Sequence, residues 1–437
     1  MARSVRGRHE QQSLFTPGFG RRPHRVAGRA SEIADLEASV LESPHHPNST
    51  GLILGQRGFG KTVLLNEIED IASSEGWMVL KVDASSPGVS QRVLAEAAKH
   101  PFAQEVLSES RSADATRTSR SVSRGVQLRW ASISEQKSET RPGPSVRDTL
   151  EVLGSATDER DTGVLLTVDE LHAGERDEMV RLAADLQLVV AREELPVAFV
   201  GAALPEVFYT MLRDPRLSFF RRCDQYEIGA VSDEEARLFF EQGVNDAGGS
   251  ITAEARELLV RHAVGYPYKM QLLGHWAWRY ADAPFREIDR DAADFAEAQA
   301  SSIVRDRVHA HIWQNISHEE RALVRAVAAH EGEAALWDVS DALPYSPESI
   351  TDMLARLDAV GALGYDGKSH VRLGPLMDAE FVSDATAALR AMEQRGGAAA
   401  QSAASGQPRR SRCNKPMKQV PGRCIRPAGH SGRCRSK

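Results

Sequence analysis

The chain has 437 residues, of which 41% are hydrophobic and 26% charged, and its formal net charge is −7. At roughly 100–200 residues per domain, this length predicts two to four domains. The first residues are basic but lack the apolar segment of a secretory signal, and no apolar run approaches the roughly 20 residues that span a bilayer. We therefore expect a cytoplasmic protein with no membrane partner.

Short apolar runs alternate with amphipathic segments in the first half of the chain. "GLILG" precedes a predicted helix from Lys61 to about Ser74, and "WMVLKVD", "GVLLTVDE" and "LPVAFVGA" follow as further strands. Apolar strands separated by helices indicate a parallel sheet covered on both faces, so the predicted fold class is α/β. Residues 108–145 are polar and rich in Ser and Arg, and we interpret them as an insertion in a surface loop that contains a short hairpin, "SVSRGVQLRWASIS".

The segment "GQRGFGKT" matches the phosphate-loop pattern G-x-x-x-x-G-K-[ST] between a predicted strand and a predicted helix. Its glycines let backbone N–H groups face a polyphosphate, and the helix adds the positive end of its dipole. Lys61 would reach the β- and γ-phosphates of ATP, and the Thr62 hydroxyl would ligate Mg²⁺. The other predicted nucleotide-binding residues of this loop are Gly55, Gln56, Arg57, Gly58, Phe59 and Gly60.

The segment "VLLTVDELH" places two acids at the carboxyl end of a predicted buried strand. Asp169 would hold Mg²⁺ through its water shell, and Glu170 would orient or deprotonate the attacking water. Two acids at this point could also merely begin a helix, since acids suit a first turn. We interpret His172 as a helix-start residue rather than as a ligand or base.

With these two motifs, residues 15–385 resemble the AAA+ superfamily of ATPases, in the branch shared by origin-recognition initiators and STAND-type signalling ATPases. "VAGRASEIADL" is similar to the segment that contacts adenine in this branch, and its matching positions are Gly28, Arg29 and Glu32. "DPRLSFFRRCDQYEIGAVSDEEA" is similar to the segment that carries an arginine facing a neighbouring subunit's γ-phosphate. The resemblance implies this role for Arg222, or for Arg221, and a surface arginine that only forms ion pairs is an equal alternative.

Two departures from the family pattern concern its sensor residues. The fourth strand ends "FVGAALPE", without the polar sensor residue that many AAA+ proteins carry there. In "GYPYKMQLLG", Tyr268 and Lys269 stand where the family has a sensor arginine. This stretch resembles the STAND-type lid signature, whose proline contacts nucleotide, which implies that role for Pro267. Missing sensors predict slow hydrolysis and a nucleotide-driven switch.

Helical patterns follow the predicted core of residues 26–230. The predicted lid covers residues 231–302 and begins with Ser232 as a helix N-cap. Residues 303–385 contain three predicted helices and a hairpin, an order that resembles a winged helix, in which the third helix and the wing contact DNA. The predicted DNA contacts are Arg356, Lys368 and Arg372. The third helix also carries Glu348, Asp352 and Asp358, which weaken the case for DNA, so docking on a protein is an equal alternative.

The two ends of the chain are basic. Residues 1–25 form an N-terminal basic segment, residues 386–411 are a predicted flexible linker, and residues 412–437 form a basic tail. The tail has the spacing C-x10-C-x5-H-x3-C, which predicts a structural zinc site whose ligands are Cys413, Cys424, His430 and Cys434. The alternative is a basic tail with incidental thiols. Cys223 is interpreted as a core or interface thiol.

The combined prediction is an initiator-like AAA+ ATPase that binds ATP and Mg²⁺ and turns over slowly. The dense positive charge of the tail favours DNA or another nucleic acid as its partner. A homo-oligomer is compatible with an arginine acting on a neighbouring subunit. Two alternatives stay open: a STAND-like signalling ATPase whose partners are proteins, and an accessory ATPase of transposition or replication.

Overall fold

The computed structural model describes residues 13–18, 23–40, 49–116, 145–190, 195–205, 211–281, 286–365 and 369–391. The chain divides into two units, residues 1–378 and residues 379–437, and the described part of the second unit, residues 379–391, is helical. Within these ranges no helix is long and apolar enough to cross a membrane. The hairpin predicted within the insertion, the linker from residue 392 onward and the basic tail lie outside the described residues.

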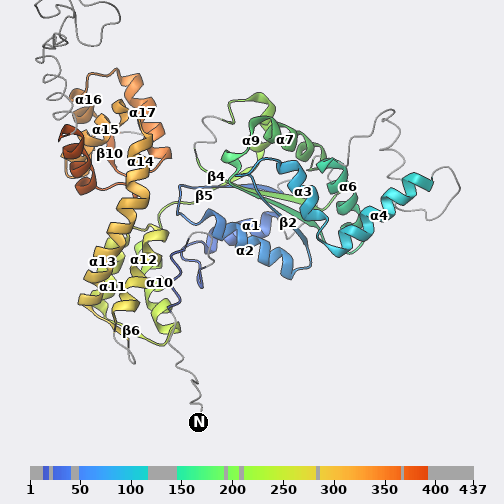
Figure 1. Ribbon diagram of the computed structural model, residues 1–437, viewed down its shortest axis with the longest axis horizontal. Coiled ribbons are helices and arrows are strands. Elements are labelled where there is room, and N and C mark those ends of the chain that lie inside the picture. Colours follow the sequence, from blue (N-terminus) through green and yellow to red (C-terminus); the bar gives the residue numbers. More distant parts are fainter. Residues whose placement is uncertain are drawn as a thin grey trace, which may run out of the picture. The chain divides into compact units, whose positions relative to one another are not determined.

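A five-stranded sheet lies between the helices of residues 30–227 in the first unit (Figure 1). Its order is β2-β3-β4-β1-β5, and all of its pairings are parallel. The strands are β1 (Thr50–Leu54), β2 (Met78–Asp83), β3 (Val164–Asp169), β4 (Val197–Ala203) and β5 (Asp224–Glu227). The predicted α/β class and the first four strands are confirmed. The fifth strand escaped prediction because it lies at the sheet edge, where its alternate residues are exposed and no apolar run is needed.

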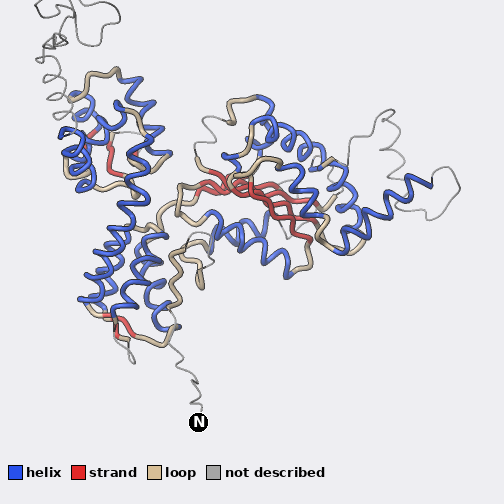
Figure 2. Tube along the Cα trace, viewed as in Figure 1, coloured by secondary structure: helices blue, strands red, loops and turns tan. Residues whose placement is uncertain are grey.

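Helices cover both faces of this sheet (Figure 2). One buried cluster joins alternate side chains of the sheet to α1 (Ala30–Val40) and α2 (Lys61–Ser74). A second cluster joins the opposite face to the helices that follow β2, β3 and β4. These helices are α3 (Val89–Ala97), α4 (Pro101–Thr116), α6 (Val146–Asp158), α7 (Arg176–Val190) and α9 (Ser218–Arg222), with the short 3-10 turns η1 (Leu171–Ala173) and η2 (Pro215–Leu217). Because α4 continues to Thr116, the predicted loop insertion begins as a helix, which corrects its expected start at residue 108.

A helical group follows the sheet and shares the buried cluster of α1 and α2. It begins as predicted, since the Ser232 hydroxyl accepts a hydrogen bond from the backbone of Glu235. Its elements are α10 (Asp233–Asp246), β6 (Ser250–Ile251), α11 (Ala253–Ala263), α12 (Pro267–Tyr280), β7 (Glu287–Ile288), α13 (Arg290–Val304), the π-helical turn η3 (Arg305–His309) and α14 (Ala310–Asn315). We call α10 to α13 the lid.

The last elements of the first unit are three helices and a three-stranded antiparallel sheet of order β8-β10-β9. They are α15 (His318–Ala329), β8 (Glu333–Ala335), α16 (Leu336–Asp341), α17 (Pro347–Ala359), β9 (Leu363–Tyr365) and β10 (His370–Leu373). The predicted helices and hairpin are therefore present, and β8 is an addition. We call residues 317–373 the C-terminal module.

Candidate nucleotide-binding site

The loop between β1 and α2 has the backbone geometry of a phosphate loop. Gly58 and Gly60 adopt positive φ angles of 80° and 95°, a conformation that other residues rarely take. A Cβ atom at Gly58 would also lie 2.3 Å from the hydroxyl oxygen of Tyr266, which comes from the lid. Glycine is therefore required there both by the backbone angle and by the packing of the lid.

Lys61 opens α2 and is buried, with 6% of its surface exposed. Its Nζ donates hydrogen bonds to the carbonyl oxygens of Gly55 (2.8 Å) and Gln56 (3.1 Å). These contacts hold the ammonium group inside the curve of the loop. A buried cation surrounded by backbone groups suits the β- and γ-phosphates of a nucleotide.

Thr62 and Asp169 meet although they are 107 residues apart in the chain. The Thr62 hydroxyl donates a hydrogen bond of 2.7 Å to Oδ2 of Asp169, which ends β3. Burial raises the pKa of Asp169, and the bond from Thr62 partly offsets this effect. A hydroxyl and a carboxylate at this distance are oxygen donors of the kind that Mg²⁺ takes while it keeps most of its waters. The pair therefore fits the predicted magnesium ligands.

Glu170 follows directly and lines the same cavity as Lys61 and Thr62. Its backbone has a positive φ of 52°, which is uncommon for a residue other than glycine. Its Oε2 lies 3.0 Å from Nε2 of His172, and this contact lowers the pKa of Glu170. The sequence interpretation of His172 as only a helix-start residue was incomplete, because the ring contacts the predicted catalytic carboxylate.

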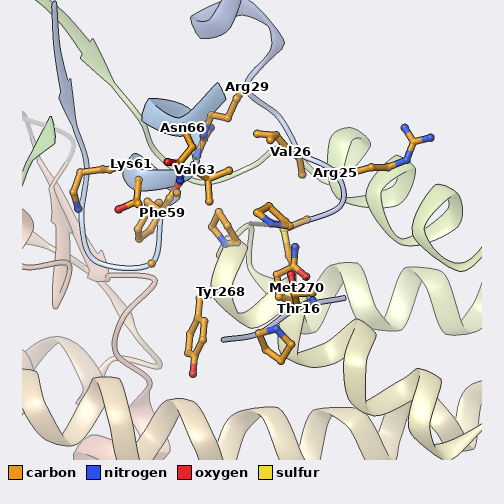
Figure 3. Close-up of a pocket in the computed structure, with 18 of the residues that line it drawn as sticks. Thr16, Arg25, Val26, Arg29, Phe59, Lys61, Val63, Asn66, Tyr268 and Met270 are labelled. Atoms are coloured by element: carbon orange, nitrogen blue, oxygen red, sulfur yellow. Dashed lines mark hydrogen bonds between the residues drawn. The ribbon is translucent and has the colours of Figure 1, made fainter. Parts of the chain in front are cut away.

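Gly58, Gly60, Lys61, Thr62 and Glu170 line one cavity, shown in Figure 3. Its volume is about 250 Å³, and it lies between the phosphate loop, the start of the chain and the lid. The cavity is lined by Thr16, Pro17, Gly18, Pro23, Arg25, Val26, Ala27, Arg29, residues 57–63, Asn66, Glu170, Phe239, Pro267, Tyr268, Met270 and Gln271. The predicted phosphate loop, the predicted adenine segment and Pro267 therefore converge on one site.

Residues 25–200 match the family model described as AAA ATPase domain. This part of the chain is an AAA ATPase domain. Two solved structures share its fold. The Aeropyrum pernix ORC2 protein, in ADPNP–ADP complexes, is 15% identical with a TM-score of 0.54, over 86% of this chain and 98% of that one. A Walker-type ATPase of Pyrococcus abyssi is 13% identical with a TM-score of 0.57, over 83% and 97% of the two chains. A search of curated proteins finds no match.

In the AAA domain, the side chain of Arg29 contacts the backbone of the phosphate loop. Its guanidinium is almost fully buried and donates to the carbonyl oxygens of Gly28, Phe59 and Gly229. Burial lowers the pKa of Arg29, and the carboxylate of Glu32, 3.6 Å away, favours the charged form. Gly28 has a positive φ of 62° and is not among the residues that line the cavity. The predicted adenine segment thus lines part of the cavity, and its buried Arg29 is hydrogen-bonded to the phosphate loop.

The lid contributes aromatic residues to the same site. Pro267 is the first residue of α12, and Tyr268 follows it along the cavity wall. Lys269 pairs instead with Glu297 at 3.3 Å. The hydroxyl of Tyr266 donates to the carbonyl oxygen of Arg57 in the phosphate loop. Sequence reasoning missed Tyr266, although its place before Pro267 in "GYPY" was a usable signal.

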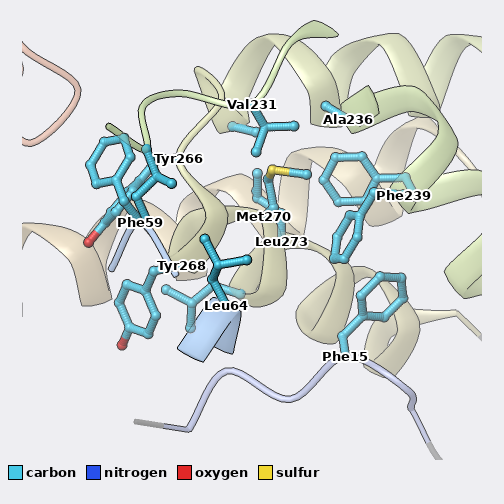
Figure 4. Packing of buried hydrophobic residues seen from close by; sticks show 14 of the residues in the cluster. Phe15, Phe59, Leu64, Val231, Ala236, Phe239, Tyr266, Tyr268, Met270 and Leu273 are labelled. Carbon is cyan, nitrogen blue, oxygen red and sulfur yellow. The ribbon is translucent and has the colours of Figure 1, made fainter. Parts of the chain in front are cut away.

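The start of the chain also reaches the cavity, which sequence reasoning missed. Phe15 is 3% exposed and packs among lid residues (Figure 4). The next residue, Thr16, lines the cavity, and its backbone N–H donates to Oε1 of Gln271 at 2.8 Å. The apolar pair Leu14–Phe15 inside a basic stretch was the available signal.

The two arginines at the end of α9 do not reach the cavity. Arg221 and Arg222 are exposed at the end of α9, and neither lines the cavity. Two other arginines, Arg176 and Arg216, donate to the carboxylate of Asp214. The contacts with Arg216, followed by that with Arg176, lower the pKa of Asp214. The role of Arg222 or Arg221 toward a neighbouring subunit stays a prediction.

Cys223 ends α9 as a buried thiol, as the sequence predicted for a core residue. Its Sγ lies 3.6 Å from the carbonyl oxygen of Phe219. Burial raises the pKa of this thiol to about 12. The side chain is therefore inert packing material rather than a reactive group.

The C-terminal module contains part of the predicted DNA contacts. Arg356 on α17 pairs with Glu320 at 2.7 Å, and Glu320 is buried at the start of α15. Arg372 is exposed on β10, whereas Lys368 lies outside the described residues. Both arginines are therefore exposed, and Arg356 also forms an ion pair with Glu320 within the module.

Gln56 of the phosphate loop contacts the C-terminal module. Its Nε2 donates to the carbonyl oxygen of Asp358 near the end of α17 at 2.6 Å. Neither Gly55 nor Gln56 lines the cavity. The Gln56 side chain therefore points to the module rather than to a nucleotide.

The predicted zinc ligands of the tail lie outside the described residues. In the part of the chain that the structure describes, no group of three or more His, Cys, Asp or Glu residues could hold a metal ion.

Proposed function

We propose that the AAA domain binds ATP with Mg²⁺ and hydrolyses it to ADP and phosphate. The observation that supports this most directly is the contact between Thr62 and Asp169 beside the phosphate loop. It joins the two sequence motifs in one place, next to a buried lysine and a second acid. A glycine-rich loop without a nucleotide would have no need of this convergence.

Each residue has a specific part in the proposed reaction. Lys61 and the loop N–H groups hold the β- and γ-phosphates. Thr62 and Asp169 would hold Mg²⁺, which would supply positive charge to the phosphate oxygens. Glu170 accepts a proton from the attacking water as its oxygen bonds to the γ-phosphorus. The bond from that phosphorus to the bridging oxygen breaks, and ADP leaves with the electron pair.

Slow turnover follows from the side chains around this site. The end of β4 presents Ala202 and Ala203, which carry no polar group, and Tyr268 stands on the lid where the related ATPases have an arginine. Fewer charged groups at the γ-phosphate mean less stabilisation of the transition state. We therefore infer a nucleotide-driven switch rather than a fast motor.

Substitution of Lys61 tests the proposed function. K61A should abolish ATP turnover and weaken ATP binding, measured by phosphate release and by titration of a fluorescent ATP analogue. K99A is the matched control, because Lys99 is exposed on the surface, pairs with nearby Glu96 and does not line the cavity. If K61A bound and hydrolysed ATP as the unaltered chain does, the proposal would be wrong.

We propose duplex DNA as the partner of this ATPase. Arg372, Lys368 and the ten basic residues between positions 409 and 437 are the groups that would contact phosphates. ATPase assays with and without DNA should compare the full chain with a chain truncated after residue 405. Turnover stimulated by DNA supports the proposal, whereas absence of DNA affinity at modest salt, with or without the tail, would contradict it.

Metal analysis of the same two proteins tests the proposed zinc site. Zinc should copurify with the full chain and be lost on truncation, because Cys413, Cys424, His430 and Cys434 are all removed. Equal zinc in both samples, or zinc in neither, would remove these residues as ligands.

A STAND-like switch is a second candidate, supported by the contact between Gln56 and α17. A module that docks on the phosphate loop can respond to the nucleotide without contacting DNA. The ion pair between Arg356 and Glu320 also supports this candidate, because Arg356 is the basic residue of α17 and its charge is paired within the module. This candidate predicts a protein partner whose binding depends on ATP and is unchanged by DNA.

A further inference from the structure

His172 connects the predicted catalytic acid to the neighbouring strand. Its Nε2 lies 3.0 Å from Oε2 of Glu170, and its Nδ1 lies 3.4 Å from the backbone nitrogen of Leu204, just beyond β4. A backbone N–H can only donate, so Nδ1 is the acceptor and Nε2 carries the proton that faces Glu170. The ring thus makes both contacts at once.

The local packing holds this ring in place. Leu171 is 1% exposed and lies against β4 at Gly201, where an added Cβ would be 2.3 Å from Cδ1 of Leu171. Glycine at this position therefore lets the turn η1 sit directly on β4. The N–H of Ala173 also donates to the carbonyl oxygen of Glu170 at 2.8 Å, which closes the turn.

The backbone of Glu170 is strained in the same turn. Its positive φ of 52° is unfavourable for a residue with a side chain, and such strain persists only where surrounding contacts impose it. The packing of Leu171 and the ring of His172 are contacts of that kind. They direct the carboxylate of Glu170 into the cavity that holds Lys61 and Thr62.

We propose that His172 is a positioning residue for ATP hydrolysis, which holds the Glu170 carboxylate toward the attacking water and links it to the end of β4. This inference rests on the proposed ATPase activity. By occupying Oε2, His172 leaves Oε1 of Glu170 to accept the proton of the water. His172, in η1, thus gives Glu170 a polar side-chain contact, whereas the side chains at the end of β4, Ala202 and Ala203, are apolar.

The test separates the rate of hydrolysis from nucleotide binding. H172A should lower kcat by about 10- to 100-fold, the cost of a poorly placed catalytic group, and leave KM and the Kd for ATP within about twofold. H172Q should recover part of the rate, because its amide N–H₂ can donate to Glu170. H262A is the matched control, since His262 also lies beside a glutamate, Glu297, but does not line the cavity.

A double substitution distinguishes positioning from general structural support. In a single-turnover assay with ATP labelled at the γ-phosphate, E170Q/H172A should be no slower than E170Q, because His172 acts through the Glu170 carboxylate. An equal fold-loss in both backgrounds, or an unchanged or increased kcat in H172A, would overturn the inference. If H172A does not fold, H172Q replaces it in the same comparison. The inference is overturned if H172Q lowers kcat by the same factor in the unaltered chain and in the E170Q background.

These outcomes separate the inference from the proposed function. Normal ATP turnover in H172A, with loss of turnover in K61A, refutes the role of His172 and leaves the ATPase intact. Absence of turnover from the unaltered chain under all conditions refutes both.

Discussion

Removal of the Phe15 ring should detach the start of the chain from the lid. The ring packs edge-on against Phe239, at a centroid distance of 5.5 Å, and lies close to Phe240. It also fills the space beside two glycines: added Cβ atoms at Gly274 and Gly243 would lie 2.4 and 2.8 Å from ring atoms. A phenylalanine buried in this way contributes about 3–5 kcal/mol relative to alanine.

The local effect can be measured at the neighbouring amide. The N–H of Thr16 donates to Gln271, so its exchange with solvent reports whether the segment is docked. At about 1.4 kcal/mol for each factor of ten, a loss of about 3 kcal/mol in F15A should speed this exchange roughly 100-fold. Hydrogen exchange of a peptide that covers residues 13–17 measures the change. ATP affinity should also fall, because Thr16 and Pro17 line the cavity.

A second substitution makes the reasoning refutable. G274A alone should destabilise the docked segment by about 1–3 kcal/mol, because its methyl group overlaps the ring. In the F15A background the methyl group occupies vacated space, and alanine should stabilise α12 by about 0.5–1 kcal/mol relative to glycine. If the two substitutions proved additive in exchange rate and in thermal unfolding, the proposed packing would be wrong.

Three further predictions concern other buried or paired groups. The thiol of Cys223 should resist alkylation at pH 8 until the chain unfolds. Its raised pKa stabilises the fold below the ordinary thiol pKa of about 8.5, and this contribution is lost as the pH rises toward about 12. Thermal melts of C223A should therefore show a smaller loss of stability at alkaline pH. Because the pKa of Asp214 is lowered, its carboxylate stabilises the fold above the ordinary carboxyl pKa of about 3.9, and this stabilisation is lost in acid. D214N should therefore lower the melting temperature at pH 7, and the difference from the unaltered chain should shrink as the pH falls. A constant difference down to pH 2 would contradict this. R356A should lower the free energy of unfolding of the C-terminal module by at most about 1 kcal/mol, because Glu320 loses an exposed partner. R356A should also weaken DNA binding less than R372A in a filter-binding assay. The reverse order would refute Arg372 as the stronger DNA contact.

Local sequence patterns predicted most of the AAA domain. The first four strands and α2 were predictable because buried parallel strands are continuously apolar and the glycine pattern of a phosphate loop requires a strand before it and a helix after it. The positions of Asp169, which ends β3, and of Glu170, which follows it, were predictable because the apolar run of that strand leads directly into them. Strand β5 was not, since an edge strand with alternate exposed residues carries no comparable pattern.

The contacts between distant side chains were harder to predict. The sequence placed Arg29 at the adenine segment, but only the fold shows that its guanidinium donates to carbonyl groups of two other loops. Phe15 gave little signal because one aromatic residue in a basic stretch has no periodicity. His172 gave none, since its contact with Leu204 depends on the register between η1 and β4.

The sequence by itself determined the local structures of this protein: the turn of the phosphate loop, the strands that lead into it, and the Ser232 cap that begins the lid. These features depend on neighbours within a few residues, where glycine angles, alternation and capping act directly. The tertiary structure decided which distant groups meet around the nucleotide site, because it alone brings Thr62 to Asp169, Tyr266 to the phosphate loop and Phe15 to the lid. Packing of side chains between elements sets those distances, and no pattern along one segment encodes them.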